Sequence, residues 1–230
     1  MQHATSSRYP GILITVEGID GAGKTELIKR LASLLHDEKH TVIVTKEPGG
    51  THLGAALKKT LLQEETECDP RVELLLFAAD RAEHFSKVVI PALTRGAIVI
   101  SDRMADSAFA YQGYGRNLDT AVIDTVNRFA MHDIQPNITL YLEISIAQAK
   151  QRYVRRHESD YNAQQLETME RQKEPFWQAV LRGYEALKKA HPHRIHTLDA
   201  TQTSDTLAAH AHTIVTQYLA QRSLTCQPPL

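Results

Sequence analysis

A short apolar run leads into a glycine-rich loop in the stretch Ile12-Leu13-Ile14-Thr15-Val16-Glu17-Gly18-Ile19-Asp20-Gly21-Ala22-Gly23-Lys24-Thr25. The run is rich in β-branched residues and stops at a glycine, which predicts a buried strand over residues 12–16. Beyond the loop, apolar residues recur with the period of a helix, at Leu27, Ile28, Leu31, Leu34 and Leu35. The stretch therefore predicts a strand, a tight loop and an amphipathic helix in succession.

The loop matches the phosphate-binding pattern G-x-x-x-x-G-K-[ST] at every fixed position from Gly18 to Thr25. Glycines permit a tight turn whose amides point at phosphate oxygens, and the next helix offers its positive N-terminal end to the same anion. Lys24 is placed to bridge the β- and γ-phosphates of a donor nucleotide, and the Thr25 hydroxyl suits Mg²⁺. The alternative is a chance match in a glycine-rich turn, and the flanking strand and helix argue against it. We predict that ATP contacts the whole loop, which comprises Gly18, Ile19, Asp20, Gly21, Ala22, Gly23, Lys24 and Thr25.

The rest of the chain repeats the alternation of strands and helices. Apolar runs predict further strands over residues 41–45, 97–101, 138–144 and 195–198. Helical patterns lie between them, over residues 53–63, from Asp69-Pro70 onward and over 203–222. This order predicts an α/β fold of the P-loop NTPase type, with three layers and a central five-stranded parallel sheet. We expect one domain over residues 10–222, tails at 1–9 and 223–230, and ligands at the carboxyl ends of the strands.

Composition excludes several classes of function. Lys and Arg number 26 against 27 Asp and Glu, so no global positive field exists to coat a nucleic acid. The two cysteines, Cys68 and Cys226, show no metal-ligand spacing and fit a reducing compartment. The first nine residues lack the apolar core of a signal peptide, and no apolar stretch is long enough for a bilayer. We therefore expect a cytoplasmic protein without nucleic-acid or membrane partners.

The phosphate-binding loop alone does not distinguish an ATPase, a GTPase and a kinase. The guanine-reading pattern N-K-x-D and the transporter signature L-S-G-G-Q are both absent from the sequence. The chain is also short for a motor protein. A kinase acting on a small molecule is the class that remains.

Five motifs in a fixed order carry a resemblance to the thymidylate kinases, clearest over residues 11–116 and weaker as far as the C-terminal helix. They are Glu17-Gly18-Ile19-Asp20-Gly21-Ala22-Gly23-Lys24-Thr25, Glu47-Pro48-Gly49-Gly50-Thr51, Phe77-Ala78-Ala79-Asp80-Arg81, Asp102-Arg103 and Ala110-Tyr111-Gln112-Gly113. The resemblance implies phosphoryl transfer from ATP to dTMP, with Mg²⁺ as cofactor, in a homodimer. The motif around Arg103 continues with Met104, where an aromatic residue or a histidine is usual in the family.

The spacing of these residues is consistent with the roles that the resemblance implies. Phe77 and Arg81 share a helix face, so one can stack on a base while the other donates to its carbonyl; the alternative is a core phenylalanine beside a surface arginine. Asp102 follows the third predicted strand and is placed to act near Mg²⁺. Arg103 resembles the arginine that holds the acceptor phosphate, for which a bidentate guanidinium is suited.

Three more acceptor roles come from the resemblance. Ser107 and Tyr111 are four residues apart and share a face, and Tyr111 resembles the residue that crowds the sugar's 2′ position. Gln112 resembles a residue that reads the base edge. Asp20 resembles the acidic residue that holds the 3′-hydroxyl, although simple loop capping is its alternative. The predicted dTMP contacts are Asp20, Phe77, Arg81, Arg103, Ser107, Tyr111 and Gln112.

Catalysis of phosphoryl transfer needs positioned cations. Some thymidylate kinases place an arginine within the phosphate loop, where this chain has Gly21-Ala22. The resemblance to the bacterial type therefore implies a lid, over about residues 147–173, that supplies the arginine. Arg152, Arg155 and Arg156 follow the fourth predicted strand. Arg152 and Arg156 share a helix face and are the leading candidates beside Lys24 and Arg103, with Arg171 in reserve; a solvated basic face is the alternative.

The sequence thus predicts that ATP and dTMP react to ADP and dTDP. Two alternatives stay open. One is a related kinase for another nucleotide or for a deoxynucleoside, and the other is a nucleotide-binding protein without catalysis.

Overall fold

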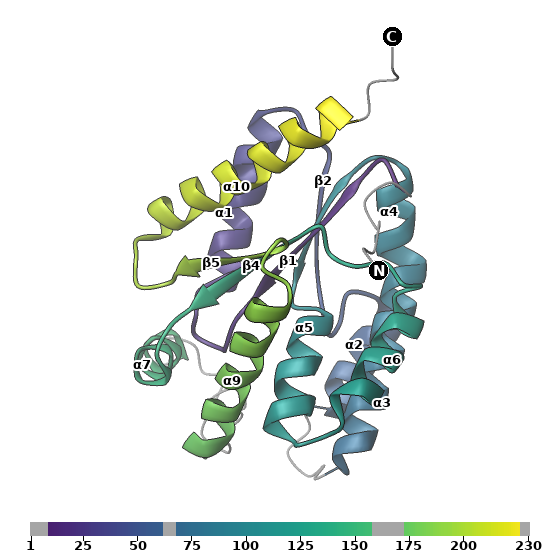
Figure 1. Ribbon diagram of the computed structural model, residues 1–230, viewed down its shortest axis with the longest axis vertical. Coiled ribbons are helices and arrows are strands. Elements are labelled where there is room, and N and C mark those ends of the chain that lie inside the picture. The colour runs from purple at the N-terminus through teal and green to yellow at the C-terminus, as the bar shows by residue number, and fades with distance from the viewer. Residues whose placement is uncertain (1–8, 62–67, 158–172, 226–230) are drawn as a thin grey trace.

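The computed structural model describes residues 9–61, 68–157 and 173–225, and the side chains of residues 156–157 and 224–225 lie outside this description. Five parallel strands form one sheet in the order β2-β3-β1-β4-β5 (Figure 1). The strands are β1 (Ile12–Glu17), β2 (Val42–Lys46), β3 (Ile98–Asp102), β4 (Ile138–Glu143) and β5 (Ile195–Asp199). The predicted fold class is confirmed, with all five strands where the apolar runs indicated them.

Helices fill the crossovers between strands, and several of them run into one another. They are α1 (Lys24–Asp37), α2 (His52–Leu61), α3 (Pro70–His84), α4 (Ile90–Thr94), α5 (Ala105–Ala108), α6 (Thr120–Ala130), α7 (Ile146–His157), α9 (Glu174–Ala190) and α10 (Ser204–Thr225). Two π-helical segments, η1 (Phe85–Val89) and η2 (Phe109–Gly115), continue α3 and α5. Helix α3 begins as predicted, because Asp69 accepts a hydrogen bond from the backbone amide of Arg71 and Pro70 occupies the first turn.

Alternate residues of the central strand β1 face two separate cores. Ile12, Ile14 and Val16 belong to the larger core, which includes the apolar faces of α1 and α10. Leu13 belongs to the smaller core with Phe85, Val99 and other residues of η1, α4 and β3. Helices α1 and α10 lie side by side on their face of the sheet (Figure 1). Burial on both faces explains why β1 reads as a continuous apolar run rather than an alternating one.

Polar residues on the second face of β1 are fully buried beside the apolar ones. Thr15 is hydrogen-bonded to Thr139 of β4, and Thr139 is bonded to both Asp106 and Arg194. The Asp106 carboxylate receives two hydrogen bonds from Arg194, at 2.6 and 2.8 Å. Glu17, at the carboxyl end of the same strand, faces the same side. The sheet therefore carries a buried polar layer that ends beside the phosphate loop.

Met104 replaces the residue expected after Arg103, and its packing is apolar. Its side chain is 1% exposed and belongs to the smaller core.

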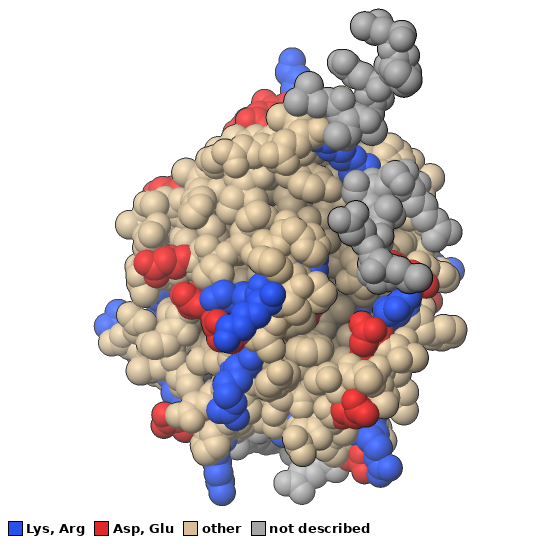
Figure 2. All heavy atoms as spheres, in the orientation of Figure 1, with Lys and Arg blue, Asp and Glu red and all other residues tan. Residues whose placement is uncertain are grey.

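Within the described ranges, no helix combines the length and the apolar character needed to cross a bilayer. Figure 2 shows acidic and basic side chains interspersed on the face that it draws.

Candidate active site

A cleft of about 920 Å³ opens at the carboxyl edge of the sheet. Its wall is built by the loop after β1, the end of β3, and helical segments α3, η2, α7 and α9. This is where a parallel α/β sheet places its ligands. The predicted residues that line it are Asp20, Gly21, Gly23, Lys24, Thr25, Phe77, Arg81, Asp102, Arg103, Ser107, Tyr111, Gln112 and Arg152.

The phosphate loop has the geometry that its glycines predicted. Gly18, Gly21 and Gly23 all adopt positive φ angles, of 139°, 81° and 101°. The Lys24 ammonium is folded over the loop, where its Nζ donates to the carbonyl oxygens of Gly18 at 3.1 Å and Ile19 at 3.2 Å. Burial and the neighbouring Arg103 lower the pKa of Lys24.

Gly21 lies where a side chain would have no room. A Cβ atom at this position would lie 2.2 Å from the carbonyl oxygen of Ala149 in α7. That distance is far below van der Waals contact, and the positive φ adds strain for any other residue. The start of α7 therefore occupies the space that a side chain at position 21 would need, and α7 itself carries the arginines.

Thr25 and Asp102 meet at the end of the sheet. The Thr25 hydroxyl donates to Oδ2 of Asp102 at 3.3 Å. Asp102 is the last residue of β3, so the strand runs one residue further than predicted. A hydroxyl and a carboxylate, both on the cleft wall, form an oxygen donor set of the kind that Mg²⁺ prefers.

Arg103 and Asp20 form an ion pair on the cleft wall, with Nη2 of Arg103 2.5 Å from Oδ1 of Asp20. Arg103 has a left-handed backbone, φ 69°, and its Nη1 donates to the Ser107 hydroxyl at 3.1 Å. Burial opposes the ionisation of Asp20, but Arg103 and Lys24 outweigh burial and lower its pKa. The Lys24 ammonium lies 3.8 Å from the same Asp20 oxygen. One carboxylate is thus flanked by two cations from different elements.

Arg81 is held by a buried network rather than exposed as a surface arginine. Its Nε donates to Glu47 at 2.8 Å and its Nη1 donates to Asn127 of α6 at 2.6 Å. Glu47 also lies 2.9 Å from Nδ1 of His84. Arg81 and Glu47 are only 2% and 5% exposed, so desolvation would be costly if either lost its partner. Arg81 and the half-buried Phe77, four residues apart on α3, both line the cleft.

Segment η2 places Tyr111 and Gln112 against the same cavity. The Arg103 guanidinium lies 5.2 Å from the centre of the Tyr111 ring, a cation–π distance. The Tyr111 ring also meets Phe176 and Trp177 of α9 edge to face. Among the described residues, its hydroxyl is buried without a hydrogen-bond partner. The Gln112 amide donates to the Glu73 carboxylate at 2.5 Å.

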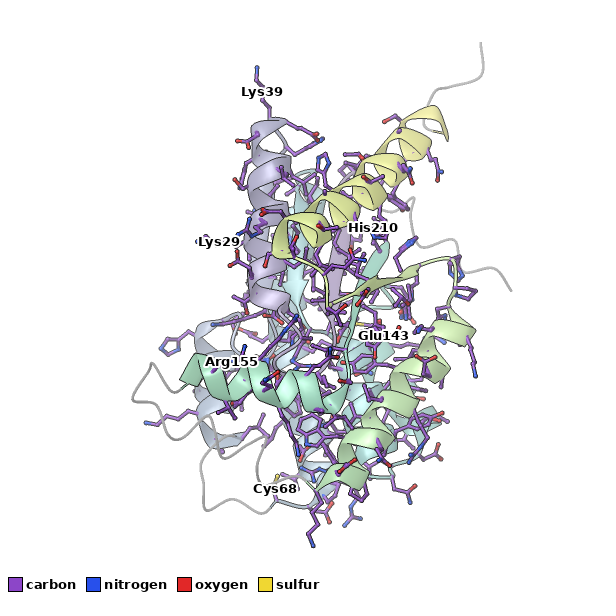
Figure 3. All side chains as sticks on the ribbon, turned by 90° about the vertical axis from the view of Figure 1, so that its left-hand side faces the viewer. Lys29, Lys39, Cys68, Glu143, Arg155 and His210 are labelled. Atoms are coloured by element: carbon purple, nitrogen blue, oxygen red, sulfur yellow. The ribbon has the colours of Figure 1, made fainter. Side chains whose placement is uncertain are left out.

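The lid candidates are only partly described. Arg152, on α7, is half-buried and lines the cleft, whereas Arg155 is exposed on the same helix, where Figure 3 labels it. Arg156 lies on α7, but its side chain is outside the described residues, and so is the whole of Arg171. Tyr153 joins Arg152 on the cleft wall.

Several residues in and beside the cleft have no role in the prediction from sequence. Glu47 lines the cleft, and the fully buried Glu17 contacts its lining through Ser107; both stand inside the quoted motifs, so the motifs were the signal that singled them out. Lys46 and Lys58 line the cleft near the loop, and burial and Lys46 lower the pKa of Lys58. Local sequence carried no comparable signal for Glu73, Arg116 and Trp177 of the cleft wall, or for Tyr184, which contacts the lining residue Ser107.

Comparison with known proteins agrees with this geometry. The family model described as thymidylate kinase matches residues 16–211. The chain is 42% identical to the thymidylate kinase of Nitrosospira multiformis, over 84% of this chain and 91% of that protein. It is 39% identical to that of Prosthecochloris aestuarii, over 92% and 94% of the two chains.

A solved structure extends the comparison to the fold. The crystal structure of thymidylate kinase from Ehrlichia chaffeensis superposes with a TM-score of 0.71 at 31% identity, covering 89% of this chain and 98% of that one. The family match spans the phosphate loop, the Asp102-Arg103 pair and the segment that carries Tyr111 and Gln112. On this sequence and structural similarity, the chain belongs to the thymidylate kinase family.

Proposed function

We propose that this thymidylate kinase transfers the γ-phosphoryl group of ATP to dTMP in one direct step, with Lys24 on the donor side and Arg103 on the acceptor side. One observation carries the proposal. Lys24 and Arg103 approach the same Asp20 oxygen from two sides, at 3.8 and 2.5 Å. A phosphate held by each cation would place donor and acceptor next to each other, as in-line transfer requires.

The chemistry needs no protein nucleophile. An oxygen of the dTMP phosphate attacks the γ-phosphorus, and the bond from that phosphorus to the bridging oxygen of ADP breaks. The acceptor is already an anion, so no proton has to be removed first. Lys24, Arg103 and Arg152 are the described cations on the cleft wall that we assign to charge stabilisation, and Arg156 is the further candidate.

Thr25 and Asp102 are the residues that would hold Mg²⁺ with ATP. Their oxygens are 3.3 Å apart at the mouth of the phosphate loop, which fits a hard cation that prefers oxygen ligands. When bound, the ion neutralises charge on the β- and γ-phosphates. Asp102 is half-buried and Thr25 is exposed, so both oxygens remain accessible from the cleft.

The acceptor base would be read by Phe77, Arg81 and Gln112. Phe77 offers a stacking face, and Arg81 offers a donor to a base carbonyl. A carboxylate only accepts hydrogen bonds, so the amide nitrogen of Gln112 must be the atom that donates to Glu73. The Gln112 carbonyl oxygen then remains as an acceptor, which complements the N3–H of thymine and not the bare N3 of cytosine.

Tyr111 and Ser107 complete the acceptor site. The Tyr111 ring is wedged between Arg103 and the aromatic residues of α9, so it cannot yield easily to a bulkier sugar. We assign it to the exclusion of a 2′-hydroxyl. Ser107 supports Arg103 through the hydrogen bond described above.

We also infer a homodimer that forms through α2, α3 and α6. These helices pack on one another in one part of the molecule (Figure 1). They carry five large apolar residues with substantial exposure, which are Leu53 at 48%, Val72 at 45%, Leu75 at 58%, Val122 at 52% and Phe129 at 85%. Exposed apolar surface of this kind marks interaction sites.

We place the protein in the cytoplasm, where free Cys68 would stay reduced.

The deciding experiment is a coupled assay of ADP release with ATP and Mg²⁺, run over a panel of nucleoside monophosphates and thymidine. Turnover with dTMP, with dUMP behind it, supports the proposal. Turnover with thymidine, or with another monophosphate, favours a related kinase and removes the acceptor roles of Phe77, Arg81 and Tyr111. Binding of ATP and dTMP without dTDP formation favours the non-catalytic alternative.

A further inference from the structure

Glu17 is a fully buried carboxylate between the phosphate loop and the segment that follows Arg103. It is the last residue of β1, directly before the first glycine of the phosphate loop, and it is 0% exposed. Burying a carboxylate is costly unless its oxygens are well satisfied. None of the roles assigned above requires an acid at this position.

Three hydrogen bonds satisfy the Glu17 carboxylate, and all three come from uncharged donors. Oε1 accepts from the backbone amide of Met104 at 2.8 Å. Oε2 accepts from the Ser107 hydroxyl at 2.6 Å and from the Tyr184 hydroxyl of α9 at 3.0 Å. The two hydroxyls are themselves 3.1 Å apart. The carboxylate thus ties β1 to the segment after Arg103 and to α9.

Arg103, Ser107 and Glu17 form a chain of hydrogen bonds, and the two charged groups at its ends determine the direction of each bond. Arg103 can only donate, and an ionised carboxylate can only accept. The Ser107 hydroxyl must therefore accept from Nη1 of Arg103 and direct its own proton to Glu17. A neutral amide in place of the carboxylate would present an N–H either to Ser107 or to the Met104 amide, so it could not accept from both sides.

We propose that Glu17 is a positioning residue for the acceptor-phosphate site, acting on Arg103 through Ser107 and through the backbone of Met104. The inference rests on the proposed function, because it gives Arg103 the task of holding the acceptor phosphate. Arg103 sits in a left-handed backbone conformation, φ 69°, which is uncommon for a non-glycine residue and needs neighbours to hold it. The hydrogen bond from the Met104 amide to Glu17 begins at the next residue and supplies such a restraint.

The state of Glu17 depends on its surroundings. Burial and the neighbouring Asp106 raise its pKa to about 7, although the hydrogen bond from Ser107 and the charge of Arg103 act in the opposite direction. A protonated carboxyl must donate from one oxygen, so it cannot accept from all three partners at once. The other groups that act on or with it electrostatically are Tyr184, Tyr111, Lys24 and Arg194.

The test is steady-state kinetics of the full chain and of Glu17→Gln, with dTMP and ATP varied separately between about pH 6 and pH 9. We expect the KM for dTMP to rise roughly tenfold in the variant, the scale of one hydrogen bond to a charged group, and the KM for ATP to change less than about twofold. In the wild type, kcat/KM for dTMP should fall below about pH 7. In the variant, kcat/KM for dTMP should fall only near pH 6, where the substrate phosphate itself becomes protonated.

A second variant guards against a simple folding defect. Tyr184→Phe removes one donor to the ionised carboxylate and should move the acid limb to higher pH, since that hydrogen bond lowers the pKa of Glu17. An acid limb unchanged in both variants, or an equal rise in the KM for ATP, would overturn the inference. If Glu17→Gln fails to fold, an unmoved limb in Tyr184→Phe overturns it alone. Loss of dTMP turnover by the wild type itself would instead refute the proposed function.

Discussion

Arg103 and Asp20 neutralise each other on the wall of the cleft, where Nη2 of Arg103 lies 2.5 Å from Oδ1 of Asp20. The two residues come from different loops, after β3 and after β1, which lie side by side in the sheet. An incoming phosphate would compete with Asp20 for the guanidinium. Asp20 would then be released toward Lys24 and the sugar, in keeping with a role at the 3′-hydroxyl.

Replacement of Arg103 tests this assignment. Arg103→Ala should raise the KM for dTMP and lower kcat, with a loss in kcat/KM on the order of a hundredfold, because charge-assisted bidentate contacts are among the strongest. ATP affinity should stay nearly constant, as measured by titration with a nucleotide analogue. Arg103→Lys keeps the positive charge but loses the two-pronged guanidinium, so its kcat/KM for dTMP should lie between those of the wild type and the alanine variant. Equal damage to ATP affinity would show that Arg103 does not serve the acceptor.

Tyr111 should control the choice between deoxyribose and ribose. Tyr111→Ala opens space beside Arg103 and should narrow the preference for dTMP over its ribose analogue by about tenfold. Tyr111→Phe is the matched control, since the hydroxyl has no hydrogen-bond partner among the described residues. The control should keep the wild-type ratio of kcat/KM values. A ratio that is unchanged in the alanine variant would refute the role.

Arg152 and Arg155 form a natural comparison on one helix. Arg152 lines the cleft, whereas Arg155, which Figure 3 labels, is exposed. Arg152→Ala should reduce kcat by roughly 10- to 1,000-fold, the range for a cation that stabilises transferred phosphoryl charge, with a small effect on dTMP binding. Arg155→Ala should be near wild type. Similar effects in both variants would point to a general basic surface rather than to a catalytic arginine.

The apolar face of α3 and α6 should determine the oligomeric state. Leu75→Glu and Phe129→Glu place charges where side chains are 58% and 85% exposed in the single chain, and both should convert a dimer to a monomer in sedimentation experiments. Val44→Glu is the control, because Val44 is 52% exposed on the edge strand β2, where it lies beside α1. A wild-type chain that sediments as a monomer would contradict the homodimer.

Glu17 should link stability to pH with a definite sign. Its pKa is about 7 in the folded chain and 4.5 without the fold, so the native state retains a proton that the unfolded state releases between these values. The stabilisation is therefore complete below about pH 4.5 and is lost as the pH rises toward 7. Glu17→Gln should not show this loss. Its free energy of unfolding, from urea denaturation, should improve relative to wild type by up to a few kcal/mol between pH 5 and 8.

That result would separate a functional from a structural carboxylate. A residue kept for stability should lower stability when it is replaced, whereas Glu17→Gln should gain relative stability at high pH while losing affinity for dTMP. A parallel fall of both quantities at every pH would count against the positioning role. The comparison uses the same variant as the kinetic test, so both readings come from one protein.

Much of the molecule follows from local sequence alone. The run from Ile12 to Val16 is apolar at every position except Thr15, and the glycines after it permit the positive φ angles of the loop. Both properties depend only on residue type and spacing, which is why the strand and the loop could be predicted. The helix pattern likewise placed Phe77 and Arg81 on one face.

Only the tertiary structure decided which distant groups share a charge or a proton. Asp20 and Arg103 are 83 residues apart, and Glu17 and Tyr184 are 167 apart. Such pairs arise from strand order and helix packing, and no local period encodes them. Gly21 is a further case. Its residue type allows a positive φ, but only the packing of α7 shows that the Ala149 carbonyl leaves no room for a side chain there. Residue identity determined the chemistry available to this protein, and the packing of remote segments determined where each charge could act.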